Sequence, residues 1–420
     1  MPADETRDAS PSGQPATSRM AVFRHRDFVL NLLCRVFSQV PLYMVMVAIS
    51  YQVYDRTGNP MDLAYIGLAS FAPAFGFALF TGYVADLFDR RLVMAACYGT
   101  MALSAGLLWA WSISEIAAVW PVYVILVILG TGRAFYQPAS NALVPNLVPV
   151  NIFPNAVAWN TSVSKMSQVV GPALGGLLYL AGAEVVYGLS AGLLVVVVIL
   201  VASIRTRTER TGKEPTSLRT LLAGLRYVYE KKIIFGAITL DLFVVILGGV
   251  TALFPIFAKD ILEVGPSGAG LLRSAIAAGA VISALALTQV TMKRSVGRIL
   301  YLTVFIFGAA TLVFGLSETF WLSMAAMVIL GAADMVSVYI RMTLLQIATP
   351  DDMRGRVGAV NSVFTGASNE IGEFRAGSMA LVIGTVPAVL VGGIGSIIVA
   401  AACWKLFPDL LSLEQLDRNI

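Results

Sequence analysis

Ionisable side chains lie inside long apolar runs of this sequence, where they could exchange protons or bind polar molecules. Six basic and four acidic residues are placed in this way: Arg35, Arg133, Lys165, Arg273, Arg341 and Arg375, with Asp241, Asp334, Glu370 and Glu373. A charge at the centre of a membrane helix costs about 2.5–3.5 kcal/mol on insertion scales unless it is paired or hydrated. Each of these side chains therefore needs a partner or a water-filled cavity.

Two of the acids occupy the middle of an apolar run. Glu370 is expected about 12 residues into its helix, near the midplane, with Glu373 one turn further on. A carboxyl group held away from water can take and release a proton near neutrality. Glu370, Glu373 and Asp241 are therefore candidate proton carriers. Alternatively, the neighbouring Arg375 pairs with one Glu, which then stays charged and serves packing only.

Other polar positions could contact cargo. Lys165 lies about 15 Å into its helix by helical rise, too deep to reach either surface, and should face water, an acid or an anionic substrate. Gln39 and Asn361 could bond a substrate, although a hydrogen bond between helices is the alternative role for both.

The composition predicts a membrane protein. Hydrophobic residues make up 57% of the 420 residues and charged residues 13%, and the mean hydropathy is +0.79, which is too apolar for a soluble globular protein. The formal charge of +4 comes from basic residues spread over short loops rather than from one patch. This distribution is typical of topology determinants and argues against a nucleic-acid partner. The cysteines show no metal-ligand spacing, so we expect no metal and no cofactor.

Twelve apolar runs predict twelve transmembrane helices. They span residues 28–51, 63–88, 92–113, 119–143, 155–180 and 185–204 in the first half, and 233–258, 269–292, 299–316, 319–347, 357–383 and 387–407 in the second. The basic loop residues fall on one side of this arrangement, with only Arg56 and Lys259 on the other. By the positive-inside rule, both termini and the central loop are cytoplasmic, and the protein is a multi-pass protein of the inner membrane.

The pattern divides the chain into five parts. We expect a disordered cytoplasmic tail (1–22), an N-terminal six-helix bundle (23–204), a cytoplasmic linker (205–232), a C-terminal six-helix bundle (233–407) and a second cytoplasmic tail (408–420). Within the linker, Leu218, Leu222, Leu225 and Tyr229 recur at helical spacing, which predicts an amphipathic helix along the inner surface.

The two halves repeat one another. A shift of 201 residues matches proline, amide and glycine positions: Pro149 with Pro350, Asn160 with Asn361, and Gly171 with Gly372. Parallel repeats of this kind indicate a pseudo-twofold axis along the membrane normal, with the substrate held between the halves. The predicted fold is an all-α polytopic membrane protein whose twelve transmembrane helices form two pseudo-twofold-related six-helix bundles.

The loop between the second and third predicted helices carries a recognisable pattern. It resembles the GxxxD(R/K)xGRR loop of the major facilitator superfamily at four positions: Gly82, Asp86, Arg90 and Arg91. Leu87 and Asp89 depart from that pattern. The resemblance covers almost the whole chain and implies a gate in which Asp86 faces the N-terminus of the eleventh helix, whose dipole favours an anion, and holds the cytoplasmic side shut.

The fifth predicted helix carries a second pattern. Gly171, Pro172, Gly175 and Gly176 are similar to the GPxxGG end of the motif that marks antiporters and exporters in this superfamily. Small residues also let helices pack closely, a structural role that is compatible with export. Stretches around Asp334, 350–357 and 368–374 look like the branch that contains the enterobactin exporter and macrolide effluxers. The resemblance implies a siderophore or an amphiphilic drug as cargo, and a lysophospholipid carrier is also similar to this branch.

Four charges occupy related places in the two halves. The resemblance implies that helices one, four, seven and ten line the central cavity, and these helices carry Arg35, Arg133, Asp241 and Asp334. The internal repeat puts opposite charges at equivalent positions. We hypothesise that cation and anion meet across the interface when the cytoplasmic side closes and separate when it opens. Alternatively, Asp334 forms a local pair with Arg341, seven residues along the same helix face.

Together these patterns predict a secondary active transporter that exports a small organic molecule by alternating access, with proton antiport. An importer or lysophospholipid flippase of the same fold is one alternative, and a non-transport membrane scaffold is another. The sequence contains no HExxH or GxxxxGK[ST] pattern, which argues against a zinc peptidase or an ATP-driven pump. We expect a monomer whose partners are its cargo, the proton and the lipid bilayer.

Overall fold

The computed structural model of the chain describes residues 20–77, 80–81, 84, 87–114, 116–206, 218–289, 295–411 and 413–414. In these residues the regular secondary structure is helical, with no strand. The first half contributes α1 (Arg26–Thr57), α2 (Pro60–Gly76), α4 (Arg90–Ile113), α5 (Trp120–Leu143), α6 (Phe153–Leu178) and α7 (Ala183–Ala202), with the short turns η1 (Ala21–Arg24), η2 (Val144–Asn146), η3 (Val150–Ile152) and η4 (Tyr179–Ala181).

The linker and the second half are helical as well. A linker helix, α8 (Leu218–Glu230), forms where the apolar spacing predicts one. It is followed by α9 (Lys232–Gly248), η5 (Thr251–Leu253), α10 (Phe254–Ile256), η6 (Phe257–Ile261), α11 (Gly265–Gln289), α12 (Val296–Leu316), α13 (Phe320–Ala348), α14 (Asp351–Ile383), α15 (Thr385–Leu406) and α16 (Pro408–Leu411).

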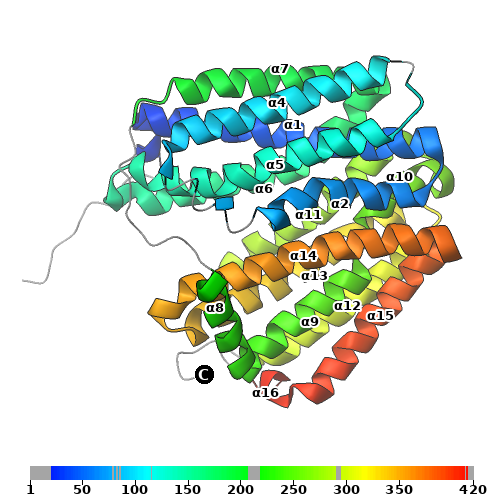
Figure 1. Cartoon of the computed structure of the whole chain (residues 1–420). Coiled ribbons are helices and arrows are strands. Elements are labelled where there is room, and N and C mark those ends of the chain that lie inside the picture. The colour runs from blue at the N-terminus through cyan, green and yellow to red at the C-terminus, as the bar shows by residue number, and fades with distance from the viewer. Residues whose placement is uncertain are drawn as a thin grey trace, which may run out of the picture.

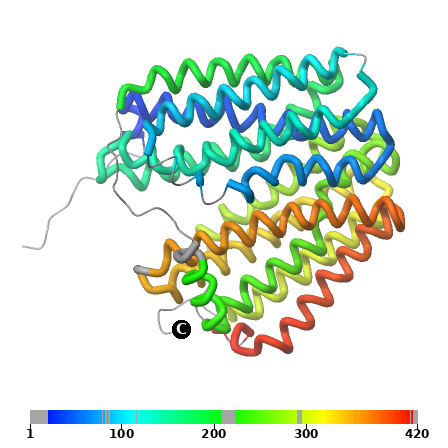
Figure 2. Tube along the Cα trace, in the orientation of Figure 1, coloured from blue at the N-terminus to red at the C-terminus, as the bar shows by residue number. Residues whose placement is uncertain are grey.

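The long helices form two bundles, one above the other in Figure 1, and the chain completes the first before it enters the second (Figure 2). This arrangement confirms the predicted fold of twelve membrane helices in two six-helix halves. The first described turn η1 lies at the same end of the molecule as α8 and α16, whereas α10 lies at the other (Figure 1). We call these the linker end and the opposite end.

The seventh membrane helix differs from its prediction. The sequence predicts one helix over 233–258, but α9 ends at Gly248 and the chain resumes in short pieces that reach Ile261. Gly249 has extended backbone angles, and a side chain on Gly248 would overlap the ring of Phe307. The prediction was wrong here because apolar periodicity does not register a break made by two adjacent glycines.

Local signals explain where neighbouring helices begin and end. Gly58 adopts a left-handed backbone conformation, φ +61°, and ends α1. The side chain of Asn59 then accepts a hydrogen bond from the backbone N–H of Met61 at 3.0 Å and caps α2. Asp89 caps α4 in the same way by accepting from the backbone N–H of Arg91 at 3.0 Å.

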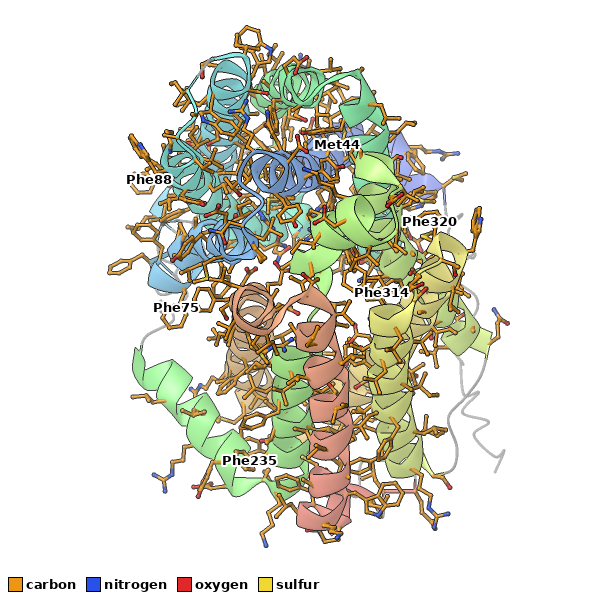
Figure 3. The ribbon with its side chains drawn as sticks, turned by 90° about the vertical axis from the view of Figure 1, so that its right-hand side faces the viewer. Met44, Phe75, Phe88, Phe235, Phe314 and Phe320 are labelled. Carbon is orange, nitrogen blue, oxygen red and sulfur yellow. The ribbon has the colours of Figure 1, made fainter. Side chains whose placement is uncertain are left out.

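Length and composition separate the long helices into two groups. Nine spans in the described part are long and apolar enough to cross a membrane. The other three long helices are α2, whose described part has 17 residues, and α6 and α14, which carry charges in their middle. Viewed from the opposite end, apolar side chains such as Phe75 and Phe88 cover the outside, whereas Met44 and Phe314 lie within the bundles (Figure 3).

The three less apolar helices lie where the halves meet. α2 packs against α14, and α6 packs against α11. At the opposite end this seam is made of backbone against backbone: a Cβ on Gly176 would overlap the carbonyl of Pro266, and one on Gly377 would lie 2.9 Å from the carbonyl oxygen of Pro60. The halves are therefore in close contact at the opposite end, and these helices need small residues there rather than a lipid-facing apolar surface.

The glycine motif of the fifth predicted helix maps onto this seam. A Cβ on Gly171 would lie 2.6 Å from Tyr43 Cβ, and one on Gly175 would lie 2.7 Å from Met44 Cα, so both glycines hold α6 close to α1. Gly176 faces the other way, toward α11, where a Cβ on Gly270 would overlap the carbonyl of Pro172. The motif thus packs α6 against both halves.

Substitution of Gly176 tests this seam. Gly176→Val should disfavour closure of the opposite end by about 1–3 kcal/mol, roughly 5- to 150-fold, because the added atoms collide with the backbone of α11. The measurement is labelling of Ala269→Cys, buried at the same end, by a membrane-impermeant maleimide, which should speed up. Gly192→Val is the matched control, since nothing lies within 4 Å of its Cβ. Equal labelling of the two variants would contradict the assignment.

Candidate transport site

A buried ion pair lies inside the second half. Asp241 of α9 pairs with Arg341 of α13, and their side chains are 9% and 3% exposed. Asp241 is therefore satisfied within its own half in this structure. The predicted alternative, a local pair between Asp334 and Arg341, is not the pair that forms among the described residues.

Arg35 has a different environment in the first half. Its guanidinium donates to the hydroxyls of Ser164 at 2.9 Å and Ser140 at 3.2 Å, which come from α6 and α5. Ser140 in turn contacts the Tyr136 hydroxyl at 3.3 Å. The side chain is 9% exposed, and its Nε has no hydrogen-bond partner. Among the described residues no carboxylate pairs with Arg35.

The other predicted cavity charges interact electrostatically with residues of the opposite half. Lys165 of α6 interacts electrostatically with Asp334 of α13, and its ammonium lies 3.5 Å from Gln168 Oε1 on its own helix. Arg133 of α5 is exposed, and its charge acts on Glu370 of α14. Each of these electrostatic interactions joins residues of different halves.

The two Glu side chains of α14 come together against the first half. A Cβ on Gly67 of α2 would lie 3.3 Å from Glu370 Oε2 and 3.4 Å from Glu373 Oε2, so the absence of a side chain makes room for both carboxylates. Glu373 Oε1 also accepts a hydrogen bond from the Thr251 hydroxyl at 2.5 Å, just after the break in the seventh membrane helix.

Arg375 does not neutralise either Glu through a hydrogen bond in the described residues. It donates to the carbonyl oxygens of Gly249 at 3.2 Å and Ala388 at 3.3 Å. The Gly249 carbonyl lies at the C-terminal end of α9, where a cation is favourable. The alternative in which Arg375 pairs with a Glu is therefore not what the structure shows.

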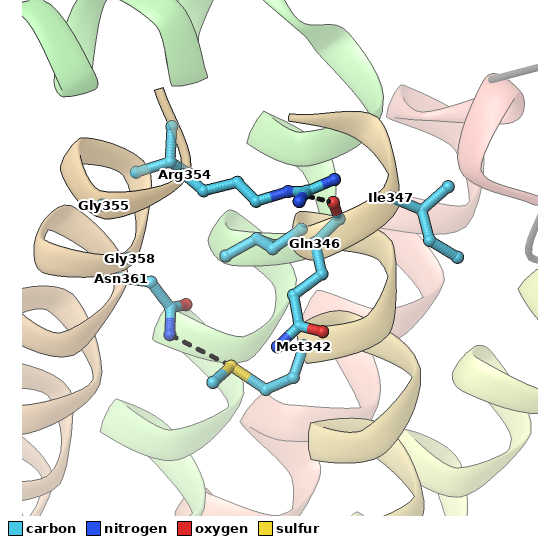
Figure 4. Close-up of a pocket in the computed structure, with 9 residues that line it drawn as sticks. Met342, Gln346, Ile347, Arg354, Gly355, Gly358 and Asn361 are labelled. Carbon is cyan, nitrogen blue, oxygen red and sulfur yellow. Dashed lines mark hydrogen bonds between the residues drawn. The ribbon is translucent and has the colours of Figure 1, made fainter. Parts of the chain in front are cut away.

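The predicted amides lie away from this charged centre or lack a partner there. Gln39, on α1, has an Oε1 without a hydrogen-bond partner. Asn361 lines a pocket of about 540 Å³ between α13 and α14 near the linker end, where its Nδ2 lies 3.5 Å from Met342 Sδ (Figure 4). In the same pocket Arg354 donates to the carbonyl oxygen of Gln346 at 3.0 Å (Figure 4).

The predicted gating loop is only partly described. Gly82 and Asp86 lie outside the described residues, so the proposed contact of Asp86 with α14 stays a prediction. Arg90 donates to the Ala142 carbonyl at 2.8 Å, and Arg91 donates to the Ile204 carbonyl at 2.7 Å. Both bonds tie the start of α4 to neighbouring helices of the first half.

Several residues join this centre that the sequence reasoning had not included in it. Arg273 of α11 interacts electrostatically with Glu370. Thr251 donates a hydrogen bond to Glu373, and Ser140 and Ser164 accept hydrogen bonds from Arg35. The repeat held a usable signal for one of them, because a shift of 201 residues places Ser140 at the position of Arg341. Neutral hydroxyls and a glycine such as Gly67 otherwise carry no pattern that marks a charged centre.

A family model described as transmembrane secretion effector matches residues 17–418. The chain belongs to the transmembrane secretion effector family. It is therefore a secretion transporter of the major facilitator superfamily and not an enzyme, as the loop and helix-five patterns indicate. The expected class of protein is confirmed; the roles of the individual site residues stay predictions.

Full-length relatives match this family assignment. Macrolide efflux protein A of Streptococcus pyogenes is 25% identical over 388 residues, which cover 89% of this chain and 93% of that protein. The enterobactin exporter EntS of Citrobacter koseri is 24% identical over 397 residues, which cover 93% of this chain and 94% of that protein.

Solved transporters share the fold. A bacterial homologue of the human lysosomal transporter Spinster, in an inward-facing and unoccupied conformation, superposes with a TM-score of 0.69 at 14% identity, over 94% of this chain and 98% of that one. The inward-open xylose transporter XylE from E. coli gives 0.68 at 13% identity, over 93% and 97%. At this identity the likeness concerns the fold alone.

The buried pair makes a stability prediction. Asp241→Asn should lower the free energy of unfolding by about 3–5 kcal/mol, because it leaves the Arg341 guanidinium buried without its counter-ion. The melting temperature of the detergent-purified protein measures the effect. Asp334→Asn is the control, since Asp334 interacts with Lys165 electrostatically without forming an ion pair or a hydrogen bond with it. The double variant Asp241→Leu with Arg341→Met should recover part of the lost stability. An Asp241→Asn variant that melts like the unaltered protein would count against a structural pair.

Proposed function

We propose that this protein exports a small organic molecule from the cytoplasm by alternating access. One observation carries the proposal: between described residues, the hydrogen bonds and ion pairs that join the two halves all lie at the opposite end. There Tyr54 donates to Asp260, and Lys259 donates to Asp55 at 2.6 Å. The pathway is thus closed at one end, which is one of the two states that alternating access requires.

The distribution of charge supplies the direction. The linker end carries Arg24, Arg26 and Arg226 among its basic residues, and the positive-inside rule places such an end in the cytoplasm. With that orientation the closed end lies outside the cytoplasm, and we assign this state to the loading of cargo for export. The names of two relatives, a macrolide efflux protein and an enterobactin exporter, support a siderophore or an amphiphilic drug as the cargo.

Proton antiport is the proposed source of energy. Two carboxylates packed against the same glycine repel each other when both are ionised, so a bound proton favours the close contact of α2 with α14. Glu370 and Glu373 meet this condition, with Arg133 and Arg273 as the flanking cations. Entry of a proton would then favour the inward-facing state, and its release into the cytoplasm would accompany the loading of cargo. Asp241 is a weaker candidate for this role because it is already paired with Arg341.

The exchange of partners across the halves stays a hypothesis for the other state. Among the described residues neither Arg35 nor Arg133 forms an ion pair with Asp241 or Asp334; Arg35 donates to hydroxyls, and Asp241 pairs with Arg341. For these residues to meet when the linker end closes, Asp241 must leave Arg341.

Proton release from inverted membrane vesicles tests the antiport. With a pH dye inside and an imposed proton gradient, addition of a macrolide or a catecholate siderophore should dissipate the gradient. Glu370→Gln and Glu373→Gln should each remove the response, because the neutral amide cannot exchange a proton. Glu230→Gln, on exposed α8, is the control and should behave like the unaltered protein. Transport that persists without any proton movement in all variants would refute the coupling.

Cross-linking tests alternating access. Asp55→Cys with Lys259→Cys, joined by a short bis-thiol reagent, should hold the opposite end shut and stop transport, and a cleavable reagent should allow recovery. Asp62→Cys with Tyr123→Cys is the matched control, because that hydrogen bond of 2.8 Å lies within the first half. The native cysteines are buried and should not interfere. Full transport through the cross-linked first pair would rule out this mechanism.

A further inference from the structure

The first and fourth helices of each half meet at equivalent places with different chemistry. In the second half this contact is the pair of Asp241 with Arg341. A shift of 206 residues matches Arg35 with Asp241, and the shift of 201 residues matches Ser140 with Arg341. Arg35 accordingly reaches only hydroxyls, at 3.2 Å for Ser140 and 2.9 Å for Ser164. The contact in the second half is neutral overall, whereas the contact in the first half keeps the positive charge of Arg35.

The described part of the first half has no buried acid to balance that charge. Its described acids all lie at helix ends: Asp27, Asp55, Asp62, Asp89 and Glu184. A guanidinium that is 9% exposed, with an unpartnered Nε, has lost most of its hydration without gaining a counter-ion. Such a charge is costly, and an anion from outside the protein lowers the cost.

Two further cations of the same half, Lys165 and Arg133, interact electrostatically with acids of the second half. Lys165 is adjacent in sequence to Ser164, and only one of its three N–H donors has a contact, at 3.5 Å to Gln168. Arg133 is exposed. The facing wall of the second half carries both signs, with Arg273 opposing the acids Asp334, Glu370 and Glu373. Uniform positive charge is therefore confined to the wall of the first half.

We propose that this wall is an anion-binding subsite that receives the acidic group of the cargo. Lys165 Nζ is the direct donor, and Arg35, behind Ser164, is a positioning residue that supplies fixed positive charge. The cargo class is an amphiphile with a carboxylate or phosphate group, entering from the linker end. This inference rests on the proposed function in placing the cargo between the halves.

Binding to the full-length protein in nanodiscs tests the subsite. The probes are dodecanoate, dodecyl phosphate and dodecyltrimethylammonium, which share one tail, measured by equilibrium dialysis with empty discs subtracted. The two anions should bind at least about tenfold more tightly than the cation, because a charge-assisted hydrogen bond is worth roughly that factor. Equal or tighter binding of the cation would overturn the proposal.

Variants assign the effect to the residues. Lys165→Gln and Arg35→Gln should each weaken binding of the anions about tenfold and leave the cation unchanged, whereas Lys165→Arg and Arg35→Lys should retain the preference. Arg226→Gln, on exposed α8, is the charge-matched control. If Arg35→Gln fails to fold, the variants Lys165→Gln, Lys165→Arg and Arg35→Lys still test whether these residues bind the anion. Unaltered binding of the anions by Lys165→Gln would exclude Lys165 as the donor and overturn the assignment.

Two additions identify the source of the anion and separate this proposal from the transport function. Competition by inorganic phosphate would indicate a soluble anion, and competition by phosphatidylglycerol in the disc would indicate a lipid headgroup; both support the subsite. Selective anion binding without any transport would count against the proposed function alone. Transport that prefers cations and survives Lys165→Gln would count against the subsite alone.

Discussion

Backbone contact between the halves at the opposite end determines much else in this molecule. Where Gly176 meets Pro266 and Gly377 meets Pro60, the glycines contribute no side chain to the contact, so the two bundles touch closely at one end. The polar contacts between the halves, Lys259 with Asp55 among them, gather at the same end of the described chain. A protein that must open at either end needs a seam that is tight without being sealed by large interlocking side chains, and glycine meets that requirement.

Charge is distributed unequally between two halves of similar architecture. The second half neutralises its inner contact through Asp241 and Arg341, whereas the first half leaves Arg35 on neutral hydroxyls. Duplication supplies the same helix positions twice, and later divergence of single residues then gives each half its own electrostatic character. The internal pair balances the buried charge of the second bundle, whereas the described part of the first bundle contains no acid that pairs with Arg35.

The break in the seventh membrane helix connects the carboxylates to the path of the chain. Arg375 holds the Gly249 carbonyl before the break, and Glu373 holds the Thr251 hydroxyl after it. Both partners come from α14, which also packs against α2 of the first half. A change in the charge of Glu373 therefore acts both on the break that follows α9 and on the contact between the halves. This proximity gives a physical route by which protonation could bias the shape of the transporter.

The sequence by itself determined the membrane class, the two-bundle architecture and the superfamily, because apolar run length, repeat spacing and loop motifs report on the bilayer and on ancestry. It also marked nearly all the buried charges, since each one interrupts an apolar run. Only the tertiary structure decided their partners. Asp241 pairs with Arg341, Arg35 donates hydrogen bonds to two serines, and the missing side chain of Gly67 leaves room for two carboxylates. Those choices depend on distances between helices that are remote in sequence, and on the absence of a side chain, neither of which leaves a periodic signal along the chain.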